Sequence, residues 1–381
     1  MDYQKAVDWL QAQTRGNRPR GPERAEELLR VLGLQNPSTR FIHIVGTNGK
    51  GSVAAYLEAA FNSTGSGGAF TSPHLISLRE RVRCNGEKVS EKKVIMYAKK
   101  VRKLSLERRP AFFDLMLGLA LDCFKSSNIK WAALEAGVGG ASDATMAVGD
   151  AEAVVLTNVA PDHLQTFHNL KKLTLDKAMA ARPGKPLITA ANGPALQIIE
   201  RLAADIGAPL YVYDSSNALF KLPIKPSLAG SYQRVNASLA AATLRLMGFN
   251  EKSVVSALGG AQLPGRLQKY TINNIDVFLD GAHNPHAAAA LSAELPAYHL
   301  LFGAHEKKDI LAILSPLQQR AVSLTFTWPL SAAPEGYDEP YIYFPEKAFK
   351  IVMEKAVQKK EPILITGSFY LLGRLLSSGF F

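Results

Sequence analysis

Phe41–Ser52, with the sequence FIHIVGTNGKGS, is the stretch that decides the fold of this chain. Its first five residues are apolar or β-branched apart from one histidine, and such a run predicts a short strand. Glycines mixed with polar residues fill positions 46–51, and an apolar pattern with helical spacing covers 52–61. Strand, glycine-rich turn and helix in this order are the context that a phosphate-binding loop requires.

The turn has the chemistry for binding a phosphate. Its glycines let backbone N–H groups approach phosphate oxygens, and the helix that follows directs its positive N-terminal end toward the anion. Lys50 is placed to reach the β- and γ-phosphates, and Ser52 offers a hydroxyl to Mg²⁺ or phosphate. The spacing is not that of a strict Walker A motif, because Gly46 lies too close to Lys50 and Gly51 separates Lys50 from Ser52. A turn that is merely rich in glycine is the alternative interpretation.

Strand and helix patterns alternate along the rest of the chain. Strands are predicted at 131–135, 153–158, 186–190, 209–213, 275–280, 298–302, 322–327 and 362–366. Helices are predicted at 3–13, 22–32, 91–104, 112–125, 169–181, 194–205, 232–247, 285–294, 345–358 and 368–377. Asn85-Gly86 between extended residues predicts a hairpin over 81–89. Strands separated by helices indicate parallel sheets that are covered on both faces.

The fold class is therefore α/β, with a domain boundary near Gln262–Arg266, where a helical region ends and a new βαβ series begins. Residues 1–265 are predicted to form an N-terminal P-loop nucleotide-binding domain with a mostly parallel sheet. Residues 266–381 are predicted to form a smaller Rossmann-like α/β domain, because just over a hundred residues suffice for a doubly wound sheet.

Composition narrows the class of protein. No apolar run reaches the 18 residues that a membrane span needs, so no membrane insertion is expected. The N-terminus lacks a basic and apolar secretory signal, and Cys84 and Cys123 show neither metal-ligand spacing nor a disulfide framework. These features predict a cytoplasmic protein in a reducing compartment.

The formal net charge of +11 leaves three interpretations open: a solvated basic surface, a field that attracts anionic substrates such as ATP, and nucleic-acid binding. The basic residues are scattered over segments 15–24, 92–109 and 355–360. No nucleic-acid-binding motif accompanies them, so no nucleic-acid partner is expected.

The heptapeptide at residues 46–52 resembles the nucleotide loop of the folylpolyglutamate/dihydrofolate synthase family, which is related to the muramyl peptide ligases. Four further segments resemble motifs of the same family in the same order. They are Thr71-Ser72-Pro73-His74-Leu75, Arg79-Glu80-Arg81-Val82 through Gly86, Asp280-Gly281-Ala282-His283-Asn284-Pro285-His286, and Ile365-Thr366-Gly367-Ser368 with Tyr370. The resemblance covers nearly the whole chain.

The resemblance implies an ATP-dependent acid–amino-acid ligase of folate metabolism. ATP phosphorylates a substrate carboxylate, the amino group of L-glutamate attacks the acyl phosphate, and an amide, ADP and phosphate are released. The acceptor would be dihydropteroate, a folate or a folyl-glutamate, so dihydrofolate synthase, folylpolyglutamate synthase and a bifunctional enzyme all stay open. The resemblance also implies a monomer.

The resemblance also implies roles for particular residues. Thr47, Asn48, Gly49, Lys50, Gly51 and Ser52 would bind ATP; Ser52, Ser72, Glu135 and His163 would hold two Mg²⁺ ions; Lys50, His163 and Lys177 would act in catalysis. Lys177 would be carbamylated by CO₂ to N6-carboxylysine, which requires the neutral amine that burial favours. Glu135 ends a predicted strand, at the edge where open α/β sheets bind ligands.

The far end of the nucleotide would be bound by Asn236, Arg266, Asp280 and His283. Arg266 lies in the predicted linker, where its guanidinium would fork onto phosphates when the domains close. The resemblance thus implies that the C-terminal domain closes over the nucleotide.

The acceptor side departs from the family pattern. The family's arginine and asparagine in the segment after Gly140 are Ala141 and Met146 here, and Ala111 begins a segment that usually carries threonine and glutamate. Phe113, Asp114, Ser142 and Asp143 are the residues expected to bind the acceptor. The departures leave open a related ligase with a non-folate acceptor, and a nucleotide-binding module without ligase activity is a further alternative.

Overall fold

The computed structural model describes residues 1–14, 16, 19–35, 37–162 and 164–381. The chain divides into two units, the first formed by Met1–Ser227 with Gln233–Gln262 and the second by Leu228–Tyr232 with Leu263–Phe381. The division of function between residues 1–265 and 266–381 stays a prediction.

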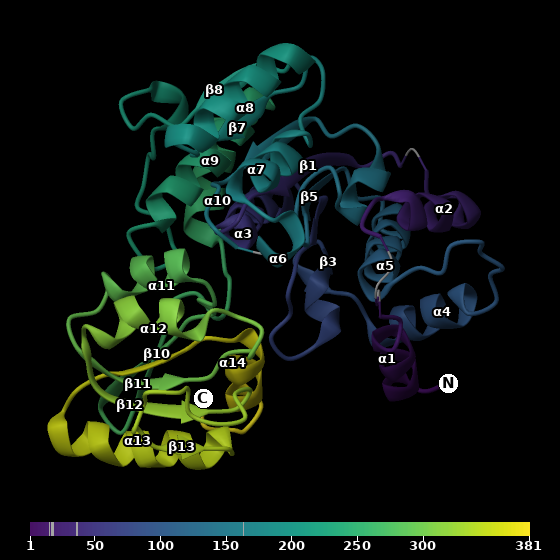
Figure 1. Ribbon diagram of the computed structural model, residues 1–381. Coiled ribbons are helices and arrows are strands. Elements are labelled where there is room, and N and C mark those ends of the chain that lie inside the picture. The colour runs from purple at the N-terminus through teal and green to yellow at the C-terminus, as the bar shows by residue number, and fades with distance from the viewer. Residues whose placement is uncertain (15, 17–18, 36, 163) are drawn as a thin grey trace. The chain divides into compact units, whose positions relative to one another are not determined.

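The first unit is built on a sheet in which the described residues form eight strands, in the order β4-β3-β2-β5-β1-β6-β7-β8 (Figure 1). The strands are β1 (Arg40–Val45), β2 (Gly67–Phe70), β3 (Val82–Cys84), β4 (Glu87–Lys88), β5 (Trp131–Glu135), β6 (Ala153–Leu156), β7 (Leu187–Thr189) and β8 (Leu210–Val212). Within this described sheet, β3 runs antiparallel to both of its neighbours, β2 and β4, and it joins β4 through the predicted Asn85-Gly86 hairpin; the other pairings are parallel. The prediction of a mostly parallel α/β sheet is confirmed.

Helices cover this sheet. They are α1 (Tyr3–Gln11), α2 (Glu23–Leu32), α3 (Lys50–Ser63), α4 (Glu91–Val101), α5 (Phe112–Ser126), α6 (Leu164–Phe167), α7 (Leu170–Ala178), α8 (Gly193–Ile206), α9 (Gln233–Leu246) and α10 (Glu251–Gly260). Helix α3 is buried around most of its circumference, because it packs on the sheet and also against α9 and α10. The phosphate loop thus leads into a central, rigid helix.

Strand β2 was not among the predicted strands, because its sequence begins with two glycines. Both glycines are required by close packing. A Cβ at Gly67 would lie 2.6 Å from the backbone nitrogen of Asn62, and a Cβ at Gly68 would lie 2.8 Å from the ring of Phe124. The glycines allow α3 and α5 to approach the strand, so here they mark a crowded strand rather than a loop.

The second unit has its own sheet, in the order β13-β12-β11-β14-β10-β9 among the described residues. Its strands are β9 (Gln268–Ile272), β10 (Ile275–Leu279), β11 (Tyr298–Phe302), β12 (Ala321–Thr327), β13 (Tyr341–Ile342) and β14 (Ile363–Thr366). Its helices are α11 (Pro285–Ser292), α12 (Ile310–Gln318), α13 (Pro345–Lys359) and α14 (Phe369–Leu376). All pairings are parallel except β9 with β10, which join through Asn273-Asn274, both at positive φ.

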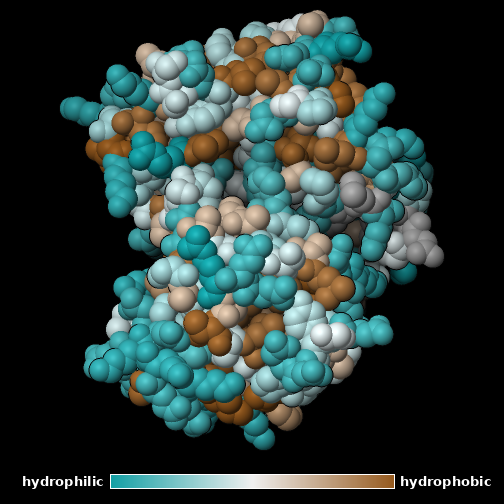
Figure 2. All heavy atoms as spheres, turned by 60° about the vertical axis from the view of Figure 1, so that its left-hand side comes forward, coloured by the Kyte–Doolittle hydropathy of each residue, from teal (hydrophilic) through white to brown (hydrophobic). Residues whose placement is uncertain are grey.

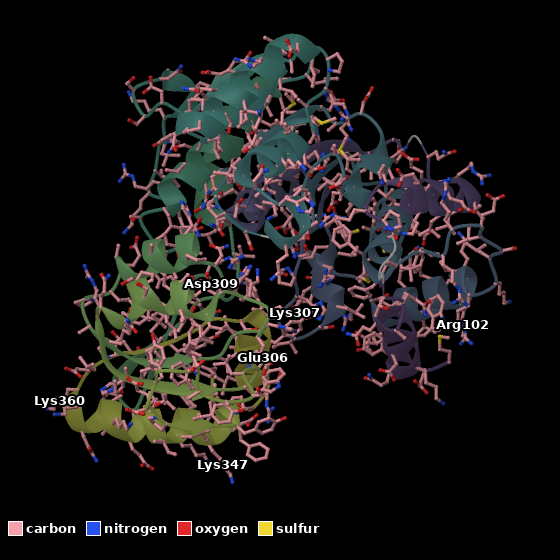
Figure 3. All side chains as sticks on the ribbon, in the orientation of Figure 1. Arg102, Glu306, Lys307, Asp309, Lys347 and Lys360 are labelled. Carbon is pink, nitrogen blue, oxygen red and sulfur yellow. The ribbon has the colours of Figure 1, made fainter. Side chains whose placement is uncertain are left out.

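The surface carries polar side chains with apolar residues in patches between them, on the face shown in Figure 2. Four cations are labelled in Figure 3: Arg102 directly follows α4, Lys307 lies after β11, and Lys347 and Lys360 lie near the two ends of α13. Across the described residues, no helix has the length and apolar character needed to cross a membrane.

Candidate functional site

Three strands of the first unit bring their carboxyl ends together at one edge. Strand β1 lies between β5 and β6, with Ile44 beside Glu135 and Val45 beside Leu156. Residues that directly follow these strands must therefore lie next to one another. The phosphate loop, the carboxylate of Glu135 and the Thr157-Asn158 segment meet at this edge.

The loop conformation requires its glycines. Gly46 and Gly49 have φ of 141° and 86°. A Cβ on Gly46 would lie 1.9 Å from Oγ1 of Thr157, and one on Gly49 would lie 2.3 Å from Oδ1 of Asn236. The backbone of the loop is thus packed against side chains from β6 and α9 with no room for a methyl group.

Replacing Gly49 with alanine should raise the KM for ATP at least about tenfold, because the added methyl displaces either the loop or the Asn236 side chain. Gly184→Ala is the matched control, since Gly184 also has positive φ but open space around its Cβ. Equal kinetic constants for the two variants would contradict the prediction.

Side chains after β6 hold the loop in place. The Thr157 hydroxyl donates to the Asn48 carbonyl over 2.6 Å, and the Asn48 N–H donates to Oδ1 of Asn158 over 3.0 Å. The Thr47 hydroxyl donates to the Ala160 carbonyl and accepts from the Ala160 N–H, both over 3.1 Å. These bonds fix the loop before any ligand binds, which lowers the cost of ordering it.

Two lysines converge on one backbone oxygen of the loop. Nζ of Lys50 donates to the carbonyls of Gly46 and Thr47, both over 3.1 Å. Nζ of Lys177, which reaches over from α7, donates to the same Gly46 carbonyl over 2.6 Å. A site with two amines beside the N-terminus of a buried helix suits a ligand that carries several negative charges.

Lys177 is only 4% exposed. Burial lowers its pKa to about 7, and the positive charge of Lys50 acts in the same direction. Asp176, Asp162 and Asp143 oppose the shift. A large fraction of Lys177 is therefore neutral near pH 7, and a neutral amine is what reaction with CO₂ requires.

A chain of amides leads from the nucleotide loop to α9. Nε2 of Gln233 donates to the Ser52 hydroxyl over 3.1 Å, and Nδ2 of Asn236 donates to Oε1 of Gln233 over 2.9 Å. All three residues are buried. The structure thus brings together Lys50, Ser52, Lys177 and Asn236, which come from three segments that lie far apart in the sequence.

Glu135 is 3% exposed and accepts a hydrogen bond from the Ser72 N–H over 2.9 Å. Ser72 is half-buried beside it. His163, the remaining predicted metal ligand, lies outside the described residues. Among the residues that are described, no three or more His, Cys, Asp or Glu side chains are grouped so as to hold a metal by themselves.

Mg²⁺ keeps several waters and takes one or two protein carboxylates together with substrate phosphates. A buried carboxylate that contacts Ser72, at the sheet edge that carries the phosphate loop, fits this requirement.

Two carboxylates accept hydrogen bonds from backbone N–H groups of the loop after β5. Asp143 accepts from the Val138 N–H over 2.9 Å, and Asp176 accepts from the Gly140 and Ser142 N–H groups over 2.7 and 3.0 Å. Burial raises the pKa of Asp143, although its hydrogen bonds from Thr145 and Val138 and the charge of Arg20 oppose the shift. Because Asp176 precedes Lys177, the loop after β5 is held by the same turn of α7 that carries Lys177.

Asp143 is also tied to β1. The Thr145 hydroxyl donates to Oδ1 of Asp143 and accepts from Nε2 of His43, with both distances 2.7 Å. Burial lowers the pKa of His43 to about 3, and Arg182 adds to this effect, so the imidazole is neutral. A buried chain of three polar side chains thus connects the strand before the phosphate loop with the loop after β5.

Replacing Thr145 with valine should lower the free energy of unfolding by about 2 to 3 kcal/mol, because the change removes two buried hydrogen bonds and leaves His43 without its acceptor. Thr325→Val is the matched control, since the buried Thr325 hydroxyl has no hydrogen-bond partner among the described residues. Urea unfolding would measure both, and an equal loss in the control would contradict the assignment.

Phe113 and Asp114, predicted to bind the acceptor, begin α5. The ring centroid of Phe113 lies 5.3 Å from that of Phe70. The Phe113 ring also packs against Gly137, two residues after Glu135, where a Cβ would lie 2.9 Å from it. Asp114 accepts from the Ala111 N–H over 2.7 Å and pairs with Nε of Arg24 over 3.0 Å. Its carboxylate therefore caps α5 and fixes α2, and its contact with an acceptor stays a prediction.

In the second unit, Asp280 is the centre of a compact arrangement. It accepts from the Leu267 and Ala282 N–H groups, both over 2.8 Å, and from the Tyr232 hydroxyl over 3.4 Å. Burial raises its pKa, and the charge of Arg266 opposes the shift.

The Arg266 guanidinium lies 4.5 Å from the ring centroid of Phe369, and the ring of His283 meets the same phenylalanine at 5.9 Å. Three of the predicted nucleotide contacts thus lie close together at the ends of β10 and β14. Figure 3 labels Glu306, Lys307 and Asp309, which follow the neighbouring β11.

Sequence reasoning missed Thr157, Asn158, Gln233 and Asp176. Thr157 and Asn158 were placed inside the predicted strand 153–158, whereas β6 ends at Leu156, so both residues lie just beyond its carboxyl end. Asp176 is adjacent to the predicted Lys177, and Gln233 lies three residues before the predicted Asn236. Only the fold shows what the side chains of Asp176 and Gln233 contact.

Comparison with known proteins gives consistent results. The model of the Mur ligase middle domain matches residues 44–219. A probable bifunctional folylpolyglutamate synthase/dihydropteroate synthase of Haloferax volcanii is 30% identical over 364 residues, which are 85% of this chain and 43% of that protein. A dihydrofolate synthase/folylpolyglutamate synthase of Bacillus subtilis is 27% identical over 421 residues, 97% of each chain. The chain thus spans less than half of the first relative and nearly all of the second.

Solved structures match the whole chain. FolC of Escherichia coli in complex with DHPP and ADP has a TM-score of 0.83 at 25% identity, with 99% of this chain and 97% of that chain covered. The bifunctional folylpolyglutamate synthase/dihydrofolate synthase of Yersinia pestis, complexed with AMPPNP and Mn ion, also has a TM-score of 0.83 at 25% identity, with 99% and 98% covered.

Proposed function

Because the chain belongs to the family of folylpolyglutamate and dihydrofolate synthases, we propose that it is an ATP-dependent ligase that joins L-glutamate to dihydropteroate, a folate or a folyl-glutamate. The observation that carries the proposal is the convergence of Lys50 and Lys177 on the Gly46 carbonyl, at the sheet edge where Glu135 is buried. This places two amines, a helix N-terminus and one carboxylate around a phosphate loop.

The reaction has two steps. An oxygen of the acceptor carboxylate attacks the γ-phosphorus of ATP, which gives an acyl phosphate and ADP. The amine of L-glutamate then attacks the acyl carbon, and the tetrahedral intermediate expels phosphate, loses a proton and leaves an amide. The charge spread over the transferred phosphoryl group must be balanced by fixed positive groups.

The chain supplies those groups. Lys50 and the N–H groups of residues 47–52 balance the β- and γ-phosphates, and the amide chain from Ser52 to Asn236 holds the start of α3 in place. Lys177, once carbamylated, presents a carboxylate at the same position. N6-carboxylysine at Lys177 is part of the proposal.

A divalent cation fits beside Glu135. Ser52, Ser72 and Glu135 would hold Mg²⁺, together with His163, and two ions are proposed. When bound, Mg²⁺ neutralises charge on the phosphates. Relatives crystallised with AMPPNP and Mn ion or with DHPP and ADP support ATP, a divalent metal and a pterin acceptor as ligands.

Arg266, Asp280 and His283 are proposed to contact the nucleotide from the second unit, and closure of that unit is part of the proposal. Phe113, Asp114, Ser142 and Asp143 are proposed to form the acceptor side. A monomeric state and a cytoplasmic location also stay predictions.

The test is a turnover assay. Purified protein is incubated with ATP, Mg²⁺, L-glutamate and either dihydropteroate or tetrahydrofolate, and ADP release and the amide product are measured. Turnover with either acceptor supports the proposal. ATP binding without turnover on either acceptor would contradict the proposal and would favour a nucleotide-binding module without ligase activity. Turnover with a non-folate acceptor would identify a related ligase, the second candidate that Ala141 and Met146 suggest.

A further inference from the structure

Arg20 reaches from the segment before α2 to the loop after β5. Its Nη2 donates a hydrogen bond to the Val138 carbonyl, and its guanidinium lies 5.3 Å from the ring centroid of Phe167. The next arginine along, Arg24, pairs with Asp114 and also donates to the Pro19 carbonyl over 2.7 Å. Arg20 and Arg24 thus hold this short segment against both parts of the predicted acceptor side, the loop after β5 and the start of α5.

A cavity of about 420 Å³ opens beneath Arg20. The polar and small residues that line it include Arg20, Glu23, Ala141, Ser142, Lys172 and Asp176. The negative charges of Asp176 and Glu23 are each stabilised by other parts of the protein. Asp176 accepts the Gly140 and Ser142 N–H groups, and Glu23 lies in the first turn of α2, where the helix dipole favours a negative charge. Arg20 and Lys172 are therefore the two positive charges that a ligand in this cavity would meet, beside the carboxylates of Glu23 and Asp176.

The cavity also contains a polar group without a partner. The Ser142 hydroxyl oxygen is fully buried, and within the described residues it has no hydrogen-bond partner. A buried hydroxyl of this kind gains a hydrogen bond when a ligand with an acceptor oxygen binds. Two cations and one hydroxyl donor match a carboxylate group.

This cavity adjoins the centre of the proposed reaction. Asp176 lines it, and the next residue, Lys177, donates to the Gly46 carbonyl of the phosphate loop. A carboxylate held here would be a neighbour of the reacting carboxylate without being the reacting group itself. Dihydropteroate has a single carboxylate, which reacts. A folyl-glutamate has a second, the α-carboxylate, close to the γ-carboxylate that reacts.

We propose that Arg20, with Lys172 and the Ser142 hydroxyl, binds the α-carboxylate of a glutamate that the acceptor already carries. This inference rests on the proposed ligase function and makes it more specific. Arg20 is then a specificity-determining residue that favours folyl-glutamate acceptors, and chain extension is an activity for which this site is built.

The experiment compares two acceptors in the intact protein. For Arg20→Ala, kcat/KM with tetrahydrofolate monoglutamate should fall about 10- to 100-fold further than kcat/KM with dihydropteroate, because only the former loses a charge-assisted hydrogen bond. Lys172→Ala, on the exposed surface of α7, should shift the same ratio in the same direction by a smaller factor. Arg20→Lys should retain part of the preference.

Arg245→Ala is the matched control, since its guanidinium also donates to backbone carbonyls but belongs to α9. Its acceptor ratio should equal that of the unmodified protein. Ala141 lines the same cavity, so adding Ala141→Arg to Arg20→Ala returns a guanidinium to the cavity lining and should restore part of the ratio.

Three outcomes separate the hypotheses. A selective loss with tetrahydrofolate supports the inference. An equal loss with both acceptors, or an unchanged ratio for both Arg20→Ala and Lys172→Ala, overturns it while leaving the ligase function intact. Unmodified protein that turns over neither acceptor contradicts the proposed function itself, and the inference fails with it.

Discussion

Lys50→Met should lower kcat by about 10³-fold, the largest effect that we expect from a change in the phosphate loop. Methionine keeps the length and apolar stem of the side chain but removes the only charge that it carries. The ammonium of Lys50 lies within hydrogen-bond distance of two loop carbonyls, so the positive charge is held in place before ATP arrives. Charge that develops on the transferred phosphoryl group would lose a fixed partner.

Single-turnover formation of ADP would measure this loss separately from ATP binding, which calorimetry reports. Lys185→Met is the matched control, because Lys185 lies in the same unit and its ammonium pairs with Glu152 over 2.9 Å, away from the loop. The control should retain kcat within about twofold. A kcat for Lys50→Met within tenfold of the unmodified value would mean that Lys50 only shapes the loop.

The central features of the fold could be predicted because they depend on local sequence. The apolar run at 41–45, the glycine turn and the helix after it lie where the pattern puts them, and the predicted strand at 131–135 coincides with β5. Once both strands were known to be parallel neighbours, Glu135 had to lie near the loop. The placement of Glu135 therefore followed from the predicted strand positions and from the general rule that open α/β sheets bind ligands at the carboxyl ends of their strands.

Features that depend on close packing could not be predicted in this way. Gly67 and Gly68 gave β2 the composition of a loop, and only the contacts with Asn62 and Phe124 explain why a strand needs them. Likewise, the bond from Gln233 to the Ser52 hydroxyl joins residues 181 positions apart. No spacing rule connects such residues, because their distance is set by how α9 packs on α3.

The acceptor side shows a further limit. Asp114 and Asp143 were predicted as acceptor contacts because they lie in segments that correspond to the acceptor side of the family that the sequence resembles. Asp114 also holds Ala111 and Arg24, and Asp143 holds Val138 and Thr145. A sequence does not distinguish a carboxylate that organises a loop from one that contacts a ligand, whereas the direction of its hydrogen bonds does. The cavity beside Arg20 was not visible in the sequence for the same reason.

Lys177→Ala should lower kcat by about 10²- to 10³-fold, and the activity of the unmodified enzyme should depend on CO₂. The pKa of Lys177 is lowered to about 7, mainly by burial and then by Lys50. Below pH 7 the amine is protonated and cannot attack CO₂; above pH 7 it is neutral and the carbamate forms. Activity should therefore fall as pH decreases through about 7, and added bicarbonate should offset part of that fall.

Two measurements distinguish a carbamate from a plain ammonium at this position. A ¹³C NMR signal from ¹³CO₂-treated protein should be present in the unmodified chain and absent from Lys177→Ala. Lys177→Arg keeps a positive charge but cannot form the carbamate. If the ammonium is the active form, Lys177→Arg should retain activity and formate should not rescue Lys177→Ala. If the carbamate is active, Lys177→Arg should be as impaired as Lys177→Ala, and formate should restore part of the rate of Lys177→Ala because its carboxylate occupies the vacated space.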